Sequence, residues 1–153
     1  MEPSGTPYKP GVFADCGSGT TGLGIGERLG ANNDVTVARS ADDKRKDPEA
    51  KKALMAEVDL VILCLPDEAA QETVALLDSM GATGPKVLDA STAYRVAPDW
   101  TYGFAALTPY PADKIRITRK FSYPGGYPSW AGALPRPLVA AARGPAPPPG
   151  PTQ

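Results

Sequence analysis

The chain has 153 residues, a length typical of a single domain. Its 16 basic and 17 acidic side chains give a formal charge of −1, which argues against nucleic acid or a charged membrane surface as partner. The longest strongly apolar run, residues 60–65, is too short to span a bilayer, and no secretory signal precedes it. With two cysteines and no export signal, we expect a cytoplasmic protein with reduced thiols.

A glycine-rich turn is the first strong feature along the chain. Residues 1–10 are expected to be a flexible lead-in, and residues 11–14 form a short apolar run that leads into the spacing G-x-G-x-x-G. Residues 23–29 then carry apolar side chains at helical positions. A strand, a glycine turn and a helix together make a pyrophosphate site, because glycine allows close backbone approach and the helix N-terminus presents unpaired N–H groups. The expected cofactor-binding residues here are Gly17, Ser18, Gly19, Thr20, Thr21 and Gly22. A purely structural turn between strand and helix remains the alternative at this point.

Strands and helices are expected to alternate after this turn. Strands are predicted at residues 35–38, 60–65 and 87–90, and helices from Pro48 after an Asp47 cap and from Glu68, after Pro66 and Asp67 as its cap, to about Met80. The run 60–65 has no polar alternation, as expected of a strand covered on both faces. This order predicts an α/β fold, a Rossmann-like parallel sheet with helices on both faces, and any ligand at the carboxyl ends of the strands.

The last third of the chain is rich in proline and less regular. Residues 115–118 are expected as one more strand, and residues 134–142 as a helix that begins near its two prolines, since proline in a helix interior costs about 3 kcal/mol. Residues 144–153 are a low-complexity proline-rich tail, expected to be extended or disordered. A PxxP spacing within it also fits docking on an aromatic groove.

The end of the second expected strand bears on the choice of cofactor. NAD sites usually place an acidic residue there to bind the ribose 2′-hydroxyl, whereas this chain has Arg39 and Ser40, with Arg45 inside a basic run close behind. A 2′-phosphate needs cationic and hydroxyl donors, so the pattern favours NADP over NAD. A solvated loop is the alternative, because neighbouring aspartates neutralise the basic run.

Several ordered blocks carry a more specific signal. They are residues 19–23, 44–47, 64–70 and 89–96, followed by Trp100 and residues 102–104. Together they closely resemble the short form of the N-acetyl-γ-glutamyl-phosphate reductases of arginine biosynthesis, from about residue 11 to 107 and more loosely to about 143. The resemblance implies an NADP-binding domain at 11–107 and a divergent start of the catalytic domain at 108–143. Within the matched blocks, Leu65, Pro66 and Ser91 are also expected to contact the cofactor.

The same resemblance implies a two-step reduction. An enzyme cysteine attacks the acyl phosphate to give a thioester, and NADPH delivers hydride, with a histidine of a second domain as acid or base. In the family the cysteine lies in Ser-Asn-Pro-Gly-Cys-Tyr-Pro-Thr-Gly, where this chain reads Ser-Tyr-Pro-Gly-Gly-Tyr-Pro-Ser-Trp from residue 122. Gly126 therefore stands at the position of the nucleophile. Cys16 is interpreted as a loop or packing variant and Cys64 as a small buried hydrophobe.

The chain contains no histidine, which removes the commonest general base and metal ligand near neutral pH. No catalytic residue and no metal site are therefore assigned. We expect a relative of the NADPH-dependent reductase that keeps the cofactor domain and is inactive as an isolated chain. Should the chain be active, the acyl phosphate is its expected substrate. The alternative is a non-catalytic NADP-binding or interaction module derived from that enzyme. Homo-oligomer formation, and whether the divergent end is natural or a reading-frame fault, stay open.

Overall fold

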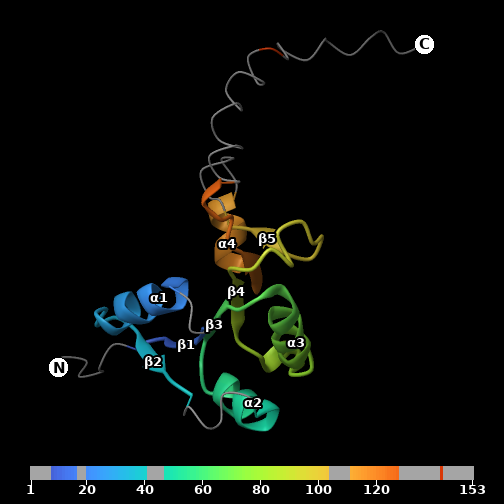
Figure 1. Ribbon diagram of the computed structural model, residues 1–153. Coiled ribbons are helices and arrows are strands. Elements are labelled where there is room, and N and C mark those ends of the chain that lie inside the picture. Colours follow the sequence, from blue (N-terminus) through green and yellow to red (C-terminus); the bar gives the residue numbers. More distant parts are fainter. Residues whose placement is uncertain (1–7, 17–19, 41–46, 104–110, 128–141, 143–153) are drawn as a thin grey trace, which may run out of the picture. The chain divides into compact units, whose positions relative to one another are not determined.

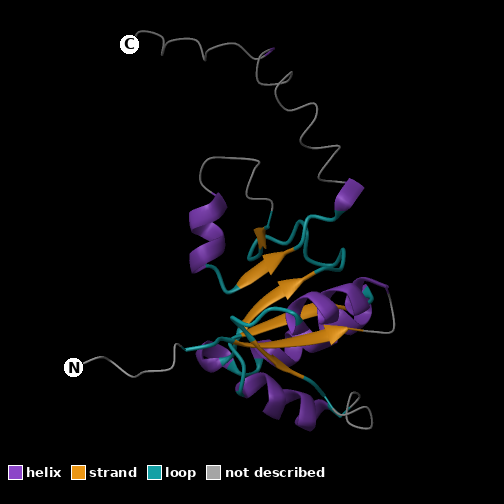
Figure 2. Ribbon diagram, turned by 90° about the vertical axis from the view of Figure 1, so that its left-hand side faces the viewer, coloured by secondary structure: helices purple, strands orange, loops and turns teal. Residues whose placement is uncertain are grey.

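The computed structural model describes residues 8–16, 20–40, 47–103, 111–127 and 142. The chain divides into two compact units, Met1–Tyr123 and Pro124–Gln153. In the first unit, six strands form one sheet in the order β2-β1-β3-β4-β6-β5 (Figures 1 and 2). Every neighbouring pair in this sheet is parallel. The predicted Rossmann-like parallel sheet is confirmed.

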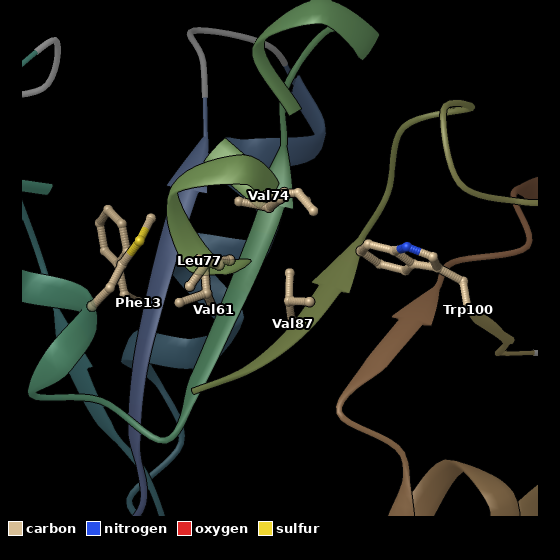
Figure 3. Packing of buried hydrophobic residues seen from close by; sticks show 8 residues of the cluster. Phe13, Val61, Val74, Leu77, Val87 and Trp100 are labelled. Atoms are coloured by element: carbon tan, nitrogen blue, oxygen red, sulfur yellow. The ribbon is translucent and has the colours of Figure 1, made fainter. Parts of the chain in front are cut away.

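The strands and helices follow one another much as the sequence predicts. The strands are β1 (Gly11–Cys16), β2 (Thr36–Ala38), β3 (Leu60–Cys64), β4 (Lys86–Asp89), β5 (Thr101–Tyr102) and β6 (Lys120–Ser122). The helices are α1 (Thr20–Gly30), α2 (Pro48–Ala56), α3 (Asp67–Asp78) and α4 (Pro111–Ile117), with a short 3₁₀ helix, η2 (Gly81–Thr83). Helix α1 lies on one side of β1 and β3, and α2 and α3 lie together on the other (Figures 1 and 3).

Two helix starts differ in how they are capped. The Asp47 side chain accepts a hydrogen bond from the Glu49 backbone N–H at 3.0 Å, and Pro48 is the first helical residue of α2, as predicted. Helix α3 begins at Asp67, with Pro66 at the cap position and no side-chain capping bond. The expectation that Asp67 caps α3 is therefore wrong, because its carboxylate is used by the loop after β4 instead.

The strand expected at residues 115–118 is a helix. Residues 111–117 form α4, and the strand that joins the sheet is β6, which begins at Lys120. Proline opens the helix without losing an intrahelical bond, and Lys114 and Arg116 in the last turn complement the negative end of its dipole. The side chain of Ile117 is 81% exposed, so the apolar residues here do not form one buried face. The sheet thus continues past residue 107. Of the helix expected at residues 134–142, only residue 142 is described, and the tail lies outside the described residues.

The core between the sheet and the α2–α3 layer is a cluster of buried apolar side chains (Figure 3). Its members are Phe13, Met55, Val61, Leu63, Val74, Leu77, Val87 and Trp100. Val61, Ile62 and Leu63 are all buried, which confirms that β3 is covered on both faces. Each such apolar side chain contributes about 1.5–3 kcal/mol when it leaves water. The cluster holds β1, β3 and β4 side by side, so the carboxyl ends of all three strands lie at the same end of the sheet.

Candidate dinucleotide-binding site

The order in which successive strands are added to the sheet reverses at β1. Strand β2 pairs with one side of β1, and β3 pairs with the other. In parallel α/β sheets such a switch point leaves a crevice at the carboxyl ends of the two strands, because the following segments depart to opposite faces. Here β1 ends at Cys16 and β3 at Cys64, and these two residues are partners in register.

Helix α1 is the element that follows β1 at this end of the sheet. Thr20 and Thr21 are its first two residues, Gly22 in the same turn is buried, and the turn contains no acidic residue. The first-turn N–H groups of a helix have no intrahelical partner, and the dipole adds partial positive charge there. The arrangement fits a pyrophosphate. The other predicted residues of this turn, Gly17, Ser18 and Gly19, lie outside the described residues.

The residues predicted to bind a 2′-phosphate do not converge on the start of α1. Arg39 follows β2 and is exposed, and its Nη2 lies 3.9 Å from the point that a Cβ on Gly30 would occupy. The guanidinium therefore lies against the last turn of α1, the negative end of the helix dipole, and the structure does not bring it to Thr20. Ser40 is half-buried beside it, and Arg45 lies outside the described residues.

Three predicted residues lie after β3 and β4. Leu65 packs against the buried core cluster, whereas Pro66 is exposed and precedes α3. The buried Ser91 hydroxyl donates to Asp89 Oδ2 at 2.6 Å and accepts from the Ala93 backbone N–H at 3.2 Å. The Ser91 hydroxyl therefore serves its own turn.

Asp89, which the sequence reasoning did not select, is central to this edge. It is fully buried at the end of β4 and is the register partner of Ser122, which is also fully buried. In the part of the chain that the structure describes, Asp89 Oδ1 and Ser122 Oγ have no hydrogen-bond partner. Burial raises the pKa of Asp89, and the hydrogen bonds from Ser91 oppose this only in part. In the sequence, the signal for Asp89 is its position as a carboxylate at the end of a short apolar strand.

Arg95 is a second polar residue of this loop that the sequence motifs do not single out. Its Nη2 donates to the Ala90 carbonyl at 3.5 Å, and its Nε is buried with no partner among the described residues. A buried guanidinium N–H without a partner can donate to an anionic group. Its place in the block 89–96 ties it to the loop that follows β4.

The position assigned to the nucleophile belongs to the second unit. Gly126 is exposed, and a Cβ built on it meets no atom within 4 Å. The neighbouring Gly125 has φ of 71°, a left-handed conformation that glycine adopts readily. Within the described ranges, no group of three or more His, Cys, Asp or Glu side chains could hold a metal ion. Over the same ranges, no helix is long and apolar enough to cross a membrane.

These features define a Rossmann-like dinucleotide-binding domain. A family model described as the NAD-binding domain of semialdehyde dehydrogenase matches residues 19–115, and the chain belongs to this family.

Individual relatives narrow the comparison. N-acetyl-γ-glutamyl-phosphate reductase 2 of Nostoc sp. is 46% identical over 132 residues, which cover 86% of this chain and 40% of the relative. N-acetyl-γ-glutamyl-phosphate reductase of Allorhizobium ampelinum is 43% identical over 130 residues, 85% of this chain and 41% of the relative. The chain thus spans about two fifths of the length of the curated relatives it matches.

Among solved structures, aspartate semialdehyde dehydrogenase from Francisella tularensis matches with a TM-score of 0.55 and 18% identity. The match covers 74% of this chain and 35% of that one. At this identity the likeness shows the fold alone.

Proposed function

We propose that this chain binds NADP(H) as the cofactor-binding portion of an N-acetyl-γ-glutamyl-phosphate reductase. The observation that carries the proposal is the start of α1, without acidic residues, at the switch point between β1 and β3. The 41–46% identity to reductases of that name supports the substrate class. A cytoplasmic location and a cofactor domain reaching from residue 11 at least to 107 belong to the same proposal.

The proposed pyrophosphate contacts come from the turn and the first turn of α1. They are Gly17, Ser18, Gly19, Thr20, Thr21 and Gly22, with Leu65, Pro66 and Ser91 on the neighbouring loops. Leu65 and Pro66 would border the crevice from the β3 side, and Ser91 would act through its turn and not through its hydroxyl, which Asp89 engages.

The preference for NADP over NAD rests on Arg39, Ser40 and Arg45. No carboxylate follows β2 directly, since the chain there reads Ala-Arg-Ser. Arg39 has to rotate away from Gly30 to reach a 2′-phosphate. The side chain is exposed, which leaves room for this rotation.

The reaction proposed for the reductase to which this portion belongs is the reduction of an acyl phosphate. NADPH, when bound, supplies the hydride for it. Gly126 stands where the family resemblance places the nucleophile, and the chain contains no histidine. We therefore propose that the 153-residue chain binds the cofactor without turning over the acyl phosphate.

Titration of the full chain with NADPH and NADH tests the proposal. NADPH should bind more tightly, and Arg39→Ser should weaken NADPH roughly tenfold while leaving NADH unchanged, because one charge-assisted contact is lost. Arg28→Ser is the matched control, since Arg28 is also an exposed arginine, in the last turn of α1. Tighter binding of NADH would overturn the NADP assignment, and binding of neither nucleotide would overturn the cofactor role and favour an interaction module.

A further inference from the structure

Cys16 and Cys64 form a pair that the proposed function does not use. They are register partners at the ends of β1 and β3, in the same series as Val12 with Leu60 and Ala14 with Ile62. The alternate residues Phe13, Val61 and Leu63 belong to the core cluster under α2 and α3. Because successive side chains in a strand point to opposite faces, both cysteines face the α1 side.

The backbone spacing suits a covalent bond between the two side chains. Neighbouring strands lie about 4.8 Å apart, which falls within the Cα separation of about 4.4–6.8 Å found across disulfides. The two side chains also lie close enough that the Cys16 thiol contributes to the raised pKa of Cys64. Both residues are half-buried, which leaves a path for a small reagent.

The Cys64 thiol is protonated at neutral pH. Burial, the hydrogen bond with the Cys16 thiol and nearby carboxylates raise the pKa of Cys64 to about 12. The thiolate is the attacking form in disulfide exchange, so Cys64 is a poor first nucleophile. We therefore assign the first attack to Cys16 and the second to Cys64.

We propose that Cys16 and Cys64 form a reversible intramolecular disulfide that controls dinucleotide binding. Glutathione disulfide is a sufficient oxidant. The Cys16 thiolate attacks one of its sulfurs and releases one glutathione thiolate. Cys64, after losing its proton to solvent, attacks the Cys16 sulfur and releases the second. Two protein thiols are oxidised to one disulfide, and one glutathione disulfide is reduced to two glutathione thiols.

Each cysteine lies directly before a segment that is proposed to contact the dinucleotide. Cys16 leads directly into the glycine turn, and Cys64 leads into Leu65 and Pro66. The bond locks the side chains at the two strand ends that border the crevice, and it constrains the segments that run from each strand end toward the dinucleotide. This step rests on the proposed function, whereas formation of the disulfide does not. By linkage, bound dinucleotide disfavours the disulfide by the same factor.

Thiol titration of the full chain tests the disulfide. After treatment with glutathione disulfide and denaturation, the two cysteine thiols should fall to none, the chain should stay monomeric on a non-reducing gel, and dithiothreitol should restore both. Mass spectrometry should find no glutathione on the wild-type chain but one on Cys64→Ser, which lacks the resolving thiol. Persisting thiols, glutathione retained on the wild-type chain, or a cross-linked dimer would each overturn the proposal.

Titration with NADP⁺ tests the control of binding. The oxidised chain should bind roughly tenfold more weakly than the reduced chain, within the usual range of coupling between sites. Cys16→Ser, compared before and after the same treatment, should show no change. Equal affinity of oxidised and reduced wild type would contradict the control. If the reduced chain does not bind NADP⁺, the proposed function fails, while the thiol titration still decides whether the disulfide forms.

Discussion

Asp67 and Thr92 join the loops that follow β3 and β4 at the carboxyl edge of the sheet. The Asp67 carboxylate accepts hydrogen bonds from the Thr92 backbone N–H at 2.9 Å and from Thr92 Oγ1 at 2.5 Å. The side-chain bond first, and the backbone bond second, lower the pKa of Asp67. The pair holds the start of α3 against the turn that contains Ser91, beside the proposed cofactor site.

Asp67→Ala should therefore destabilise the chain in a pH-dependent way. Because the pKa of Asp67 is depressed in the folded state, its contribution is present above the unfolded value of about 3.9 and is lost as the pH falls through the folded value. Urea unfolding at pH 7 and pH 3 measures this. The variant should be less stable than wild type at pH 7, and this deficit should be smaller at pH 3. Asp34→Ala, at an exposed carboxylate, is the control, and an Asp67→Ala deficit unchanged between the two pH values would contradict the expectation.

Asp89→Asn should show the opposite trend with pH. Burial raises the pKa of Asp89, so its contribution is fully present below the unfolded value and is lost as the pH rises through the folded value. The amide carries no charge to desolvate, and its oxygen can still accept from Ser91. The unfolding free energy of Asp89→Asn relative to wild type should thus increase between pH 4 and pH 7. A decrease over this interval would show that the buried carboxylate is stabilised by more than Ser91.

The parts of the fold that local chemistry determines could be predicted from the sequence. The Asp47 cap and Pro48 fix the start of α2, and the uninterrupted apolar run at β3 is typical of a strand inside a sheet. Strand β6 was misplaced because two isoleucines in α4 have strand propensity, whereas the helix start and the exposed Ile117 are decided by tertiary context. The two-residue strand β5 carries too short a pattern to be detected.

The candidate site divides in the same way. The glycine spacing predicts an anion site from the sequence alone, since the expected contacts are local to the turn and the helix start. The pairing of Asp89 with Ser122, and of Cys16 with Cys64, depends on register between strands far apart in the sequence. No spacing within a single segment could reveal these pairs.

Truncation of the core should have a much larger effect than truncation of the surface. Leu63 is completely buried in the middle of the core cluster, so Leu63→Ala should lower the unfolding free energy by about 2–5 kcal/mol. Val96 is 95% exposed, and Val96→Ala should change it by less than about 0.5 kcal/mol. Chemical denaturation of both variants measures the difference. Similar values for the two would contradict the packing described for β3.

Gly126→Cys should not by itself produce a reductase. A side chain fits at this position, since a Cβ meets no atom within 4 Å, so a lack of activity would not reflect steric exclusion. The expected reason is the absence of a histidine to act as acid or base. Oxidation of NADPH in the presence of N-acetylglutamyl phosphate is the assay, with the wild-type chain as control. Substantial turnover by Gly126→Cys would show that the nucleophile alone was missing.

Backbone amide NMR of the full chain, titrated with NADP⁺, tests most directly where the dinucleotide binds. The amides of Thr20, Thr21 and Gly22 should shift, together with that of Leu65 across the crevice. A surface pocket lined by Val87, Thr118 and Lys120 lies at the amino ends of β4 and β6, and the backbone amide signals of these three residues should not shift. Shifts confined to that pocket, with none in the first turn of α1, would contradict a cofactor site at the carboxyl edge of β1 and β3.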